Sequence, residues 1–398
     1  MRYCSFCGRS EDEVSVMVNG TNGCVCDECA SHISNIINEK KELVHKHTMN
    51  GVMKPVEIKK FLDQYVIGQD KCKERIAVAV YNHYKRISDK NVTDDVEIAK
   101  SNVLILGDTG SGKSLIAESI ARMLDVPFAI ADATVLTQAG YVGEDVESIL
   151  SKLLQAADYN VERAERGIIF IDEIDKIARK GDNPSITRDV SGEGVQQGLL
   201  KLLEGSIINV PPQGGRKHPD QKFIQVNTKN ILFICAGAFD GIESKISARL
   251  NKHSVGFGAT EERANNINKK EKHILSKVTV QDIKKFGLIP EIIGRLPVIT
   301  YTETLDKDAL VKILTEPKNA IIKQYVKLLE MDGIKLTFDN EVLDYIADKA
   351  IKNKIGARAL RGIVEDLMSN AMFTLPTSGE SEFNVTIDYA KEKLEEAA

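Results

Sequence analysis

The central part of the chain shows short, continuous apolar runs separated by longer stretches in which apolar residues recur every three or four positions. The short runs are typical of strands buried on both faces, and the longer stretches are typical of amphipathic helices. Strands are therefore expected at residues 102–106, 128–131, 168–171, 223–226 and 231–236, and helices at 115–124, 144–159 and 193–203. Strands that alternate with helices predict an α/β fold with a parallel sheet.

The pattern changes toward both ends of the chain. Beyond about residue 306 most stretches read as helix, with residues 335–338 and 384–387 as the only strand candidates. Residues 30–43 also read as a helix, whose apolar stripe is either a dimerisation or docking face or part of its own core. We therefore expect four segments: a small unit at 1–45, a linker at 46–56, a large α/β domain at 57–305 and a smaller α-rich domain at 306–398.

A phosphate-binding motif lies between the first expected strand and the first expected helix of the α/β domain. Residues 107–114, GDTGSGKS, have the spacing G-x-x-x-x-G-K-[ST] of a P-loop, and a strand before and a helix after it are the context this motif requires. The glycines let the backbone curl, so that its N–H groups and the helix N-terminus face an anion. A simple glycine-rich turn is the alternative, but the eight motif positions and their flanks agree on a P-loop.

The motif assigns a nucleotide site to consecutive residues. Lys113 is expected to reach the β- and γ-phosphates, and Ser114 to hold Mg²⁺. The expected ATP-binding positions of this stretch are Asp108, Thr109, Gly110, Ser111, Gly112, Lys113, Ser114 and Leu115.

Two carboxylates follow the strand expected at 168–171. A P-loop enzyme needs an acid at the end of a neighbouring strand to hold Mg²⁺, and Asp172 meets this requirement. Glu173 is then placed to polarise the attacking water. On their own, these two residues are equally consistent with an N-cap and acidic first turn of a helix. Because a P-loop precedes them, we favour ATP hydrolysis.

Five of the seven cysteines fall within the first 29 residues. Cys4-x-x-Cys7 and Cys26-x-x-Cys29 have the pattern of a structural Zn²⁺ site, although unliganded thiols are the alternative. Cys24 could replace Cys26, but only Cys26 has the two-residue spacing to Cys29. Because so short a unit cannot bury enough core, the metal is expected to supply its stability. Its acidic residues favour a protein partner over a nucleic acid.

Composition and charge narrow the class of protein. The 398 residues are 42% hydrophobic and 28% charged, with a net charge of −5 and no long basic stripe, which argues against nucleic acid as the main partner. No apolar run approaches the ~20 residues that span a bilayer, and the N-terminus lacks the apolar core of a signal peptide. We therefore expect a cytoplasmic protein that contacts no membrane. No protease motif of the kind Gly-x-Ser-x-Gly or His-Glu-x-x-His occurs, so ATP hydrolysis is its only expected chemistry.

Taken together, the motifs resemble the ClpX family of AAA+ unfoldases over nearly the whole chain, from Cys4 to about Val364. They are the two cysteine pairs, the P-loop and residues 65–69, 140–144, 171–175, 216–218, 289–295 and 356–358. The resemblance implies a zinc-binding domain, a large AAA+ domain and a small α-rich domain, assembled as a homohexameric ring with nucleotide between subunits. It implies that the ring uses ATP to unfold substrate proteins, some brought by adaptors, and feeds them to the ClpP peptidase.

The resemblance also implies roles for residues outside the P-loop. Val66 and Ile67 would line the adenine pocket, Arg295 would be the arginine finger that reaches a neighbour's γ-phosphate, and Arg358 would sense nucleotide from the small domain. An always-charged, bidentate donor suits a phosphate whose charge grows during transfer. Without the family, a surface ion pair is the simpler interpretation of each arginine.

Substrate contacts are implied in three loops. Tyr141 and Val142 lie between glycines that allow the backbone to swing, and in the family such a loop grips substrate in the central pore; an ordinary turn is the alternative. Arg188, within residues 183–194, would belong to the second pore loop. Positive charge at the pore entrance, which would attract a substrate's carboxyl terminus, would come from Arg216, Lys217 and His218.

The tripeptide Val255, Gly256 and Phe257 corresponds to the ClpP-docking tip of the family, in which isoleucine or leucine is usual at the first position. Three other departures concern the nucleotide site. Asp108 replaces the usual proline and brings a negative charge near the phosphates, and Ser114 replaces the commoner threonine. No Asn or Asp ends the strand expected at 231–236, where many AAA+ proteins carry a γ-phosphate sensor.

Two other classes of protein fit part of the pattern. One is a nucleic-acid-acting P-loop ATPase with a zinc ribbon, such as a helicase or clamp loader; the acidic balance and Tyr141 argue against it. The other is a nucleotide-gated scaffold without turnover, which requires Glu173 or Arg295 to be silent.

Overall fold

A computed structural model describes residues 3–20, 23–32, 53–88, 96, 98–137, 144–179, 192–211, 223–251, 271–353 and 356–396. The chain divides into two compact units, Met1–Met53 and Lys54–Ala398. No helix in the part of the chain that the structure describes is long and apolar enough to cross a membrane.

The amino-terminal unit is built around one short antiparallel ladder. Strand β1 (Met17–Asn19) pairs with β2 (Cys24–Cys26), after a single turn η1 (Glu11–Glu13). Residues 27–32 are helical, so the predicted helix starts before residue 30. Its first turn carries acids and a cysteine in place of an apolar stripe, which is why periodicity missed it. Most of the range predicted as helix, from residue 33 to 43, lies outside the described residues.

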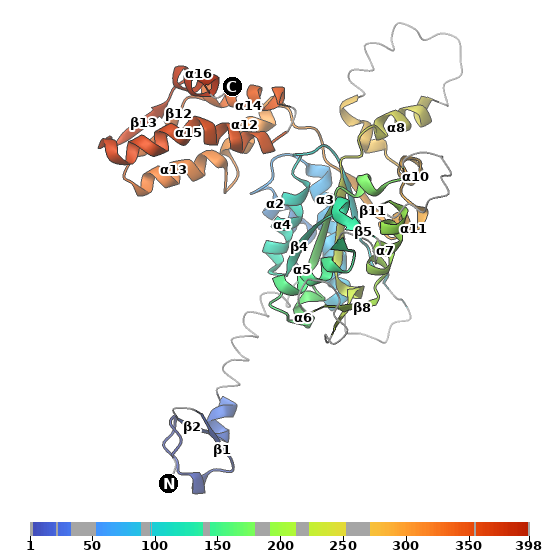
Figure 1. Cartoon of the computed structure of the whole chain (residues 1–398), viewed down its shortest axis with the longest axis vertical. Helices are drawn as coiled ribbons and strands as arrows, with labels where there is room; N and C mark the ends of the chain where they lie inside the picture. The colour runs from blue at the N-terminus through green and yellow to red at the C-terminus, as the bar shows by residue number, and fades with distance from the viewer. Residues whose placement is uncertain are drawn as a thin grey trace. The chain divides into compact units, whose positions relative to one another are not determined.

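A five-stranded parallel sheet forms the centre of the second unit, in the order β11-β3-β10-β7-β4. The predicted α/β fold is therefore confirmed (Figure 1). The strands are β3 (Val103–Leu106), β4 (Phe128–Asp132), β7 (Ile168–Asp172), β10 (Leu232–Gly237) and β11 (Val298–Tyr301). Strands β3 and β10 are buried along their whole length, which accounts for their continuous apolar runs.

Two helical layers cover the two faces of the sheet. Alternate residues of β3 point to opposite faces: Val103 and Ile105 pack with helices α2 (Pro55–Leu62), α3 (Asp70–Ser88) and α4 (Lys113–Leu124). Leu104 and Leu106 join the core on the other face. Helices on that side include α5 (Ser148–Ala156), α7 (Glu193–Glu204), α8 (Ile242–Asn251), α10 (Val280–Phe286) and α11 (Pro290–Gly294). The connections contain short elements: η2 (Ala133–Val135), β5 (Leu136–Thr137), β6 (Glu144–Asp145), α6 (Val161–Ala164), η3 (Ile174–Ile177), η4 (Thr228–Asn230) and η5 (Glu271–Lys277).

Three predictions about this domain need correction. The strand expected at 223–226 is β9 (Ile224–Asn227), which forms an antiparallel hairpin with β8 (Ile207–Val210) and does not join the central sheet. The edge strand β11 was not anticipated. The helix expected at 144–159 covers only Ser148–Ala156, because Asp158 and Tyr159 adopt left-handed backbone angles (φ 52° and 59°) that end it.

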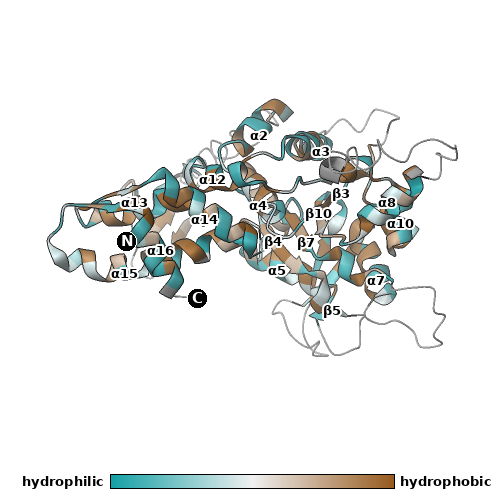
Figure 2. Ribbon diagram, turned by 90° about the horizontal axis from the view of Figure 1, so that it is seen from above, coloured by the Kyte–Doolittle hydropathy of each residue, from teal (hydrophilic) through white to brown (hydrophobic). Residues whose placement is uncertain are grey.

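The carboxy-terminal part is mostly helical, as predicted. It contains α12 (Lys307–Thr315), α13 (Ile321–Met331), α14 (Asn340–Lys352), α15 (Arg358–Ser378) and α16 (Ile387–Glu396) around a core of their own. Strand β12 (Lys335–Phe338) lies where expected, and β13 (Glu382–Val385), which begins two residues before the predicted 384, pairs with it in parallel. Figure 2 shows that these helices carry both hydrophobic and hydrophilic residues along their length. This is expected of helices that bury one side in a core and expose the other.

Candidate functional site

The P-loop turns tightly between β3 and α4. Gly112 caps α4 with a left-handed backbone angle of φ 98°, which glycine adopts without strain. Gly107 passes so close to Thr302 that a Cβ atom at this position would overlap the threonine hydroxyl. The amino-terminal end of α4 consequently faces the loop, and its first N–H groups have no partner within the helix. This arrangement can receive an anion.

Lys113 lies at the centre of the loop and is buried. Its Nζ donates hydrogen bonds to the carbonyl oxygens of Gly107 (2.6 Å) and Asp108 (2.8 Å). Burial lowers the pKa of the Lys113 ammonium, and the nearby carboxylate of Asp172 opposes this effect. A second anionic group close to Nζ, such as a phosphate, would stabilise the charged form in the same way.

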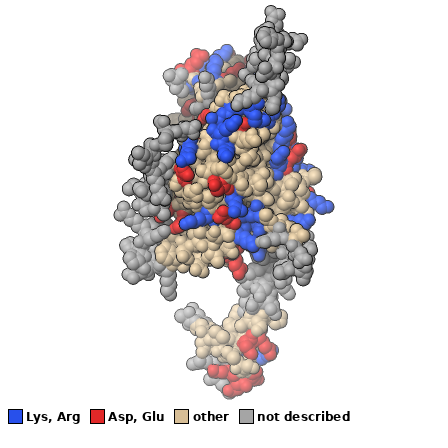
Figure 3. Space-filling view, turned by 90° about the vertical axis from the view of Figure 1, so that its right-hand side faces the viewer, with Lys and Arg blue, Asp and Glu red and all other residues tan. Residues whose placement is uncertain are grey.

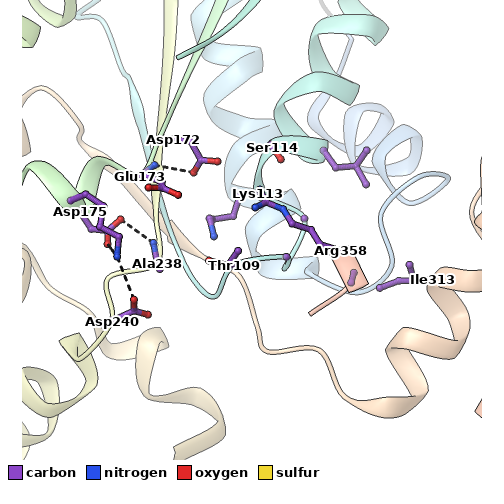
Figure 4. A pocket seen from close by; sticks show the side chains of 15 residues that line it. Thr109, Lys113, Ser114, Asp172, Glu173, Asp175, Ala238, Asp240, Ile313 and Arg358 are labelled. Carbon is purple, nitrogen blue, oxygen red and sulfur yellow. Dashed lines mark hydrogen bonds and ion pairs between the residues drawn. The ribbon is translucent and has the colours of Figure 1, made fainter. Parts of the chain in front are cut away.

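A cavity of about 310 Å³ opens in front of the loop. It is lined by groups from four separate parts of the chain (Figure 4). They are Thr109, Gly110, Gly112, Lys113, Ser114 and Leu115 of the P-loop, Asp172, Glu173, Asp175 and Lys176 after β7, Ala238 and Asp240 after β10, and Ile313, Ala357 and Arg358 of the carboxy-terminal helices. Six of the eight predicted P-loop positions thus meet the predicted acids in one place, whereas Asp108 and Ser111 are not among the lining residues.

The two acids sit on an unusual turn at the carboxyl end of β7. Asp172 ends the strand, and its Oδ1 accepts a hydrogen bond from the backbone N–H of Glu173 (3.0 Å). Glu173 adopts a left-handed backbone (φ 55°, ψ 33°), which costs a residue other than glycine about 1–3 kcal/mol. Such strain is concentrated at functional sites. The turn leaves both carboxylates in the lining of the cavity, where Ser114 also offers its hydroxyl.

A second acidic group was missed by the sequence analysis. Asp175 is buried, and its Oδ1 accepts a hydrogen bond from the N–H of Ala238, which directly follows β10 (3.2 Å). Lys176 lies 3.4 Å from the Asp175 carboxylate and 3.5 Å from that of Asp240. No Asn or Asp ends β10, but Asp240 enters the cavity three residues further on. Both acids follow a buried strand of the central sheet within a few residues, and this position in the sequence could have identified them as candidates for the site.

Arg358 reaches the same cavity from the first residue of α15. The turn before it packs directly on the P-loop: Gly356 has φ 66°, and a Cβ there would lie 2.9 Å from the carbonyl oxygen of Thr109. In Figure 4 Arg358 and the two acids lie on opposite sides of Lys113. A group bound at the P-loop would therefore be within reach of both.

Arg295 lies elsewhere. It follows α11, its guanidinium donates through Nε (3.2 Å) and an Nη atom (3.0 Å) to Oε1 of Glu204, and its side chain is 53% exposed. It is not among the residues that line the cavity of its own chain. An arginine-finger role consequently requires a second copy of the chain.

Val66 and Ile67 occupy the turn between α2 and α3. Val66 is buried and its Cγ1 lies 3.9 Å from the point where a Gly112 Cβ would stand, so it packs beside the start of α4. Asp108 is exposed and outside the cavity lining, because its Oδ2 accepts a hydrogen bond from the Thr304 hydroxyl (2.9 Å).

The four predicted zinc ligands come together in the amino-terminal unit. The Sγ atoms of Cys4, Cys7, Cys26 and Cys29 all lie within 4.8 Å of one another. The fifth thiol, Cys24, points away and donates to Asn19 Oδ1 (3.1 Å), which resolves the alternative between Cys24 and Cys26. Backbone hydrogen bonds from Cys7 and Cys26 lower the pKa of the Cys4 thiol to about 6. Side-chain hydrogen bonds with Cys26 and Cys7 raise the pKa of the Cys29 thiol to about 12. A divalent cation would stabilise all four thiolates together.

We expect one Zn²⁺ per chain, and we expect Cys26→Ser to lose it. Serine keeps the size of the side chain but removes a thiolate that zinc requires. Metal analysis of the purified protein measures the loss directly. Cys24→Ser is the matched control, because it changes a neighbouring thiol outside the cluster and should leave the zinc content at one. Equal zinc in the two variants would refute the site.

Several predicted substrate and docking residues lie outside the described residues, and their roles stay predictions. They are Tyr141, Val142, Arg188, Arg216, Lys217, His218, Val255, Gly256 and Phe257.

Three family models match successive parts of the chain: the ClpX C4-type zinc finger at residues 2–39, the AAA domain (Cdc48 subfamily) at 98–299, and the C-terminal, D2-small domain, of ClpB protein at 305–388. The chain is also similar to several curated proteins named ATP-dependent Clp protease ATP-binding subunit ClpX. Those of Bacteroides thetaiotaomicron and Bacteroides fragilis are each 64% identical over 402 residues, covering 100% of this chain and 96% of the relative. That of Porphyromonas gingivalis is 59% identical over 397 residues, covering 98% and 96%. With this identity over the full length, a four-cysteine cluster and a P-loop cavity with its acids, the chain belongs to the ClpX family of AAA ATPases.

Proposed function

We propose that this chain is an ATP-driven protein unfoldase that works as a homohexamer and passes unfolded substrates to the ClpP peptidase. The observation that carries the proposal is the cavity shared by Lys113, Glu173 and Arg358. In this proposal Lys113 binds phosphate, Glu173 is the general base that activates water, and Arg358 brings a positive charge from the small domain. The names of the relatives, ATP-binding subunits of an ATP-dependent protease, support the same function.

The residues of the cavity divide the work of hydrolysis. When ATP binds, Lys113 exchanges its two carbonyl partners for the β- and γ-phosphates. Ser114 and Asp172 offer the oxygen ligands that Mg²⁺ prefers, and the ion would neutralise charge on the phosphates. Glu173 orients and polarises the attacking water, and Val66 and Ile67 line the adenine site. Catalysis of this kind depends mainly on positioning and electrostatics.

Arg358 supplies the link from chemistry to movement. Arg358 lines the cavity from the first residue of α15, and its guanidinium would bind the γ-phosphate of ATP there. Hydrolysis and phosphate release remove the partner, and the contact between the small domain and the P-loop weakens. Repeated in a ring, this change moves Tyr141 and Val142 along the pore and pulls on the substrate, while Arg188, Arg216, Lys217 and His218 guide it.

The direct test is degradation of a tagged, folded reporter by the purified chain with ClpP and ATP. Loss of reporter should require all three components. ATPase stimulation by an unfolded protein, compared with stimulation by DNA, separates this function from a nucleic-acid-acting ATPase. On the face shown in Figure 3, Lys and Arg side chains lie beside uncharged groups and some acids. Stimulation by DNA alone would contradict the proposal.

We expect Phe257→Ala to abolish ClpP-dependent degradation, with ATPase and unfolding activity unchanged. In the sequence Phe257 lies between Gly256 and Gly258, and Val255 directly precedes Gly256. We infer that these two apolar residues enter apolar clefts on ClpP. Val255→Ile should tighten ClpP binding, because it adds one methylene worth ~0.8 kcal/mol when buried, and several loops engage at once.

Reporter degradation and unfolding without ClpP are measured side by side. Phe257→Leu is the matched variant, since it keeps an apolar side chain and should retain part of the activity. Degradation by Phe257→Ala at the parent rate would mean that docking depends on another surface.

A further inference from the structure

Three consecutive residues are hydrogen-bonded to the P-loop, two of them directly and the middle one through Gln69. Thr302, Glu303 and Thr304 follow the edge strand β11 and precede α12, the first helix of the small domain. Thr302 and Thr304 use their hydroxyls, and Glu303 uses its backbone N–H and carbonyl oxygen. We call the hydrogen-bonded set of Gln69, Asp108, Ser111, Thr302, Glu303 and Thr304 the P-loop clasp.

The buried part of the clasp is a pair of hydroxyls. Ser111 Oγ lies 2.7 Å from Thr302 Oγ1, and both residues are buried. Each hydroxyl also has a backbone acceptor: the carbonyl oxygen of Asp108 for Ser111 (2.8 Å) and that of Leu106 for Thr302 (3.4 Å). Either hydroxyl can therefore donate to the other. The backbone N–H of Thr302 donates to the carbonyl oxygen of Leu106, the last residue of β3 (2.8 Å). Thr302 thus holds both the entry and the turn of the P-loop.

Gln69 closes the clasp from the other side. It is buried, and its amide binds both peptide groups of Glu303: Oε1 accepts from the N–H (2.6 Å) and Nε2 donates to the carbonyl oxygen (2.8 Å). The same Nε2 lies 3.4 Å from the carbonyl oxygen of Ser111. Gln69 holds this position with a left-handed backbone (φ 61°). A side-chain amide therefore connects the predicted adenine segment, the P-loop and the chain leading to the small domain.

The exposed part of the clasp explains a departure from the family. Asp108 stands where proline is usual in the family, and an unconstrained carboxylate there would repel phosphates. The Thr304 hydroxyl donates to Asp108 Oδ2 and directs it outside the cavity lining. The Asp108 carboxylate thus binds the segment that leads from β11 to the small domain.

We propose that the clasp residues position the P-loop for nucleotide binding and couple it to the small domain. The proposal rests on the proposed function in one respect, that ATP is the ligand of the P-loop. The clasp holds the turn of residues 108–111 in the shape that receives phosphates. The segment it grips leads directly into the small domain, which supplies Ile313 and Arg358 to the same cavity. A shift of the P-loop on phosphate binding is therefore passed to the base of that domain.

The first test compares Thr302→Val with Thr302→Ser. Valine keeps the shape but removes the hydroxyl, so Ser111 loses a buried hydrogen bond and the loop is less often in its receptive shape. We expect Thr302→Val to bind a fluorescent ADP and ATPγS roughly two- to tenfold more weakly, with the turnover at saturating ATP changed less than twofold. Thr302→Ser should bind as the parent does.

Thr300→Val is the matched control. Thr300 is also buried on β11, and its side chain hydrogen-bonds the Cys72 thiol of α3. It should leave nucleotide affinity unchanged. Parent-like affinity of Thr302→Val, or equal loss in Thr302→Val and Thr300→Val, overturns the positioning role.

The second test measures coupling by a double-mutant cycle with Arg358→Ala. If the clasp transmits to the small domain, Arg358→Ala should weaken ATPγS binding less in the Thr302→Val background than in the parent. Strictly additive effects overturn the coupling. These binding measurements need no hydrolysis, no ClpP and no protein substrate, so their outcome does not depend on the degradation test. Conversely, parent-like nucleotide binding by the variants would contradict the clasp and leave the proposed unfoldase function unaffected.

Discussion

Glu173→Gln should bind ATP as the parent does and hydrolyse it roughly a hundredfold or more slowly. Glutamine keeps the size of the side chain and its hydrogen-bonding oxygen but loses the charge that polarises water. The structure gives a further reason to expect a large effect, because Glu173 holds a strained left-handed backbone in the lining of the cavity. Strain maintained next to a phosphate-binding loop is most simply explained by a function at that position.

Phosphate release measures turnover, and a fluorescent ATP analogue measures binding. Glu162→Gln is the matched control, since it removes the same charge from an exposed position on α6 and should leave both quantities unchanged. Near-normal turnover by Glu173→Gln in the assembled ring would contradict the assignment of Glu173 as the general base.

The sequence predicted those parts of the site that are local. The P-loop spans eight consecutive residues between a strand and a helix, and the acids directly follow a buried apolar run, so spacing alone located Lys113, Ser114, Asp172 and Glu173. The structure brings all four to one cavity. The four cysteines were predictable for the same reason, because two pairs with the spacing of zinc ligands recur close together.

Contacts between distant residues had no such signature. Gln69 and Glu303 are separated by 234 positions, and a buried amide that binds a peptide group leaves no periodic pattern. Arg358 was assigned from the family alone, since any arginine at a helix start can be an ion pair. Periodicity also reports burial without naming the partner strand. It therefore located β9 within a residue but placed it in the wrong sheet, and it missed the edge strand β11.

The arginine finger is the other prediction with a large expected effect. Arg295→Ala should bind ATP but lose turnover by roughly a thousandfold, the scale on which arginine fingers act in phosphoryl transfer. In a single chain the guanidinium is half-exposed, is held by Glu204 and does not line its own cavity. Its expected target is therefore the γ-phosphate bound by a neighbouring subunit. Arg163→Ala is a suitable control, because the Arg163 side chain is similarly exposed and also forms an ion pair, 3.8 Å from Asp158.

Mixing inactive subunits tests whether Arg295 acts across the interface. An Arg295→Ala subunit keeps its own Lys113 and Glu173 but offers no finger, whereas a Glu173→Gln subunit offers a finger but has no base. Where the two adjoin, the site of the first receives the finger of the second, so mixed rings should recover part of the ATPase activity that neither variant has alone. Mixing Arg295→Ala with the double variant Glu173→Gln/Arg295→Ala supplies no finger and should recover nothing. If activity stays absent at every mixing ratio although mixed rings form, Arg295 does not act in trans, and its ion pair with Glu204 is a feature of the surface alone.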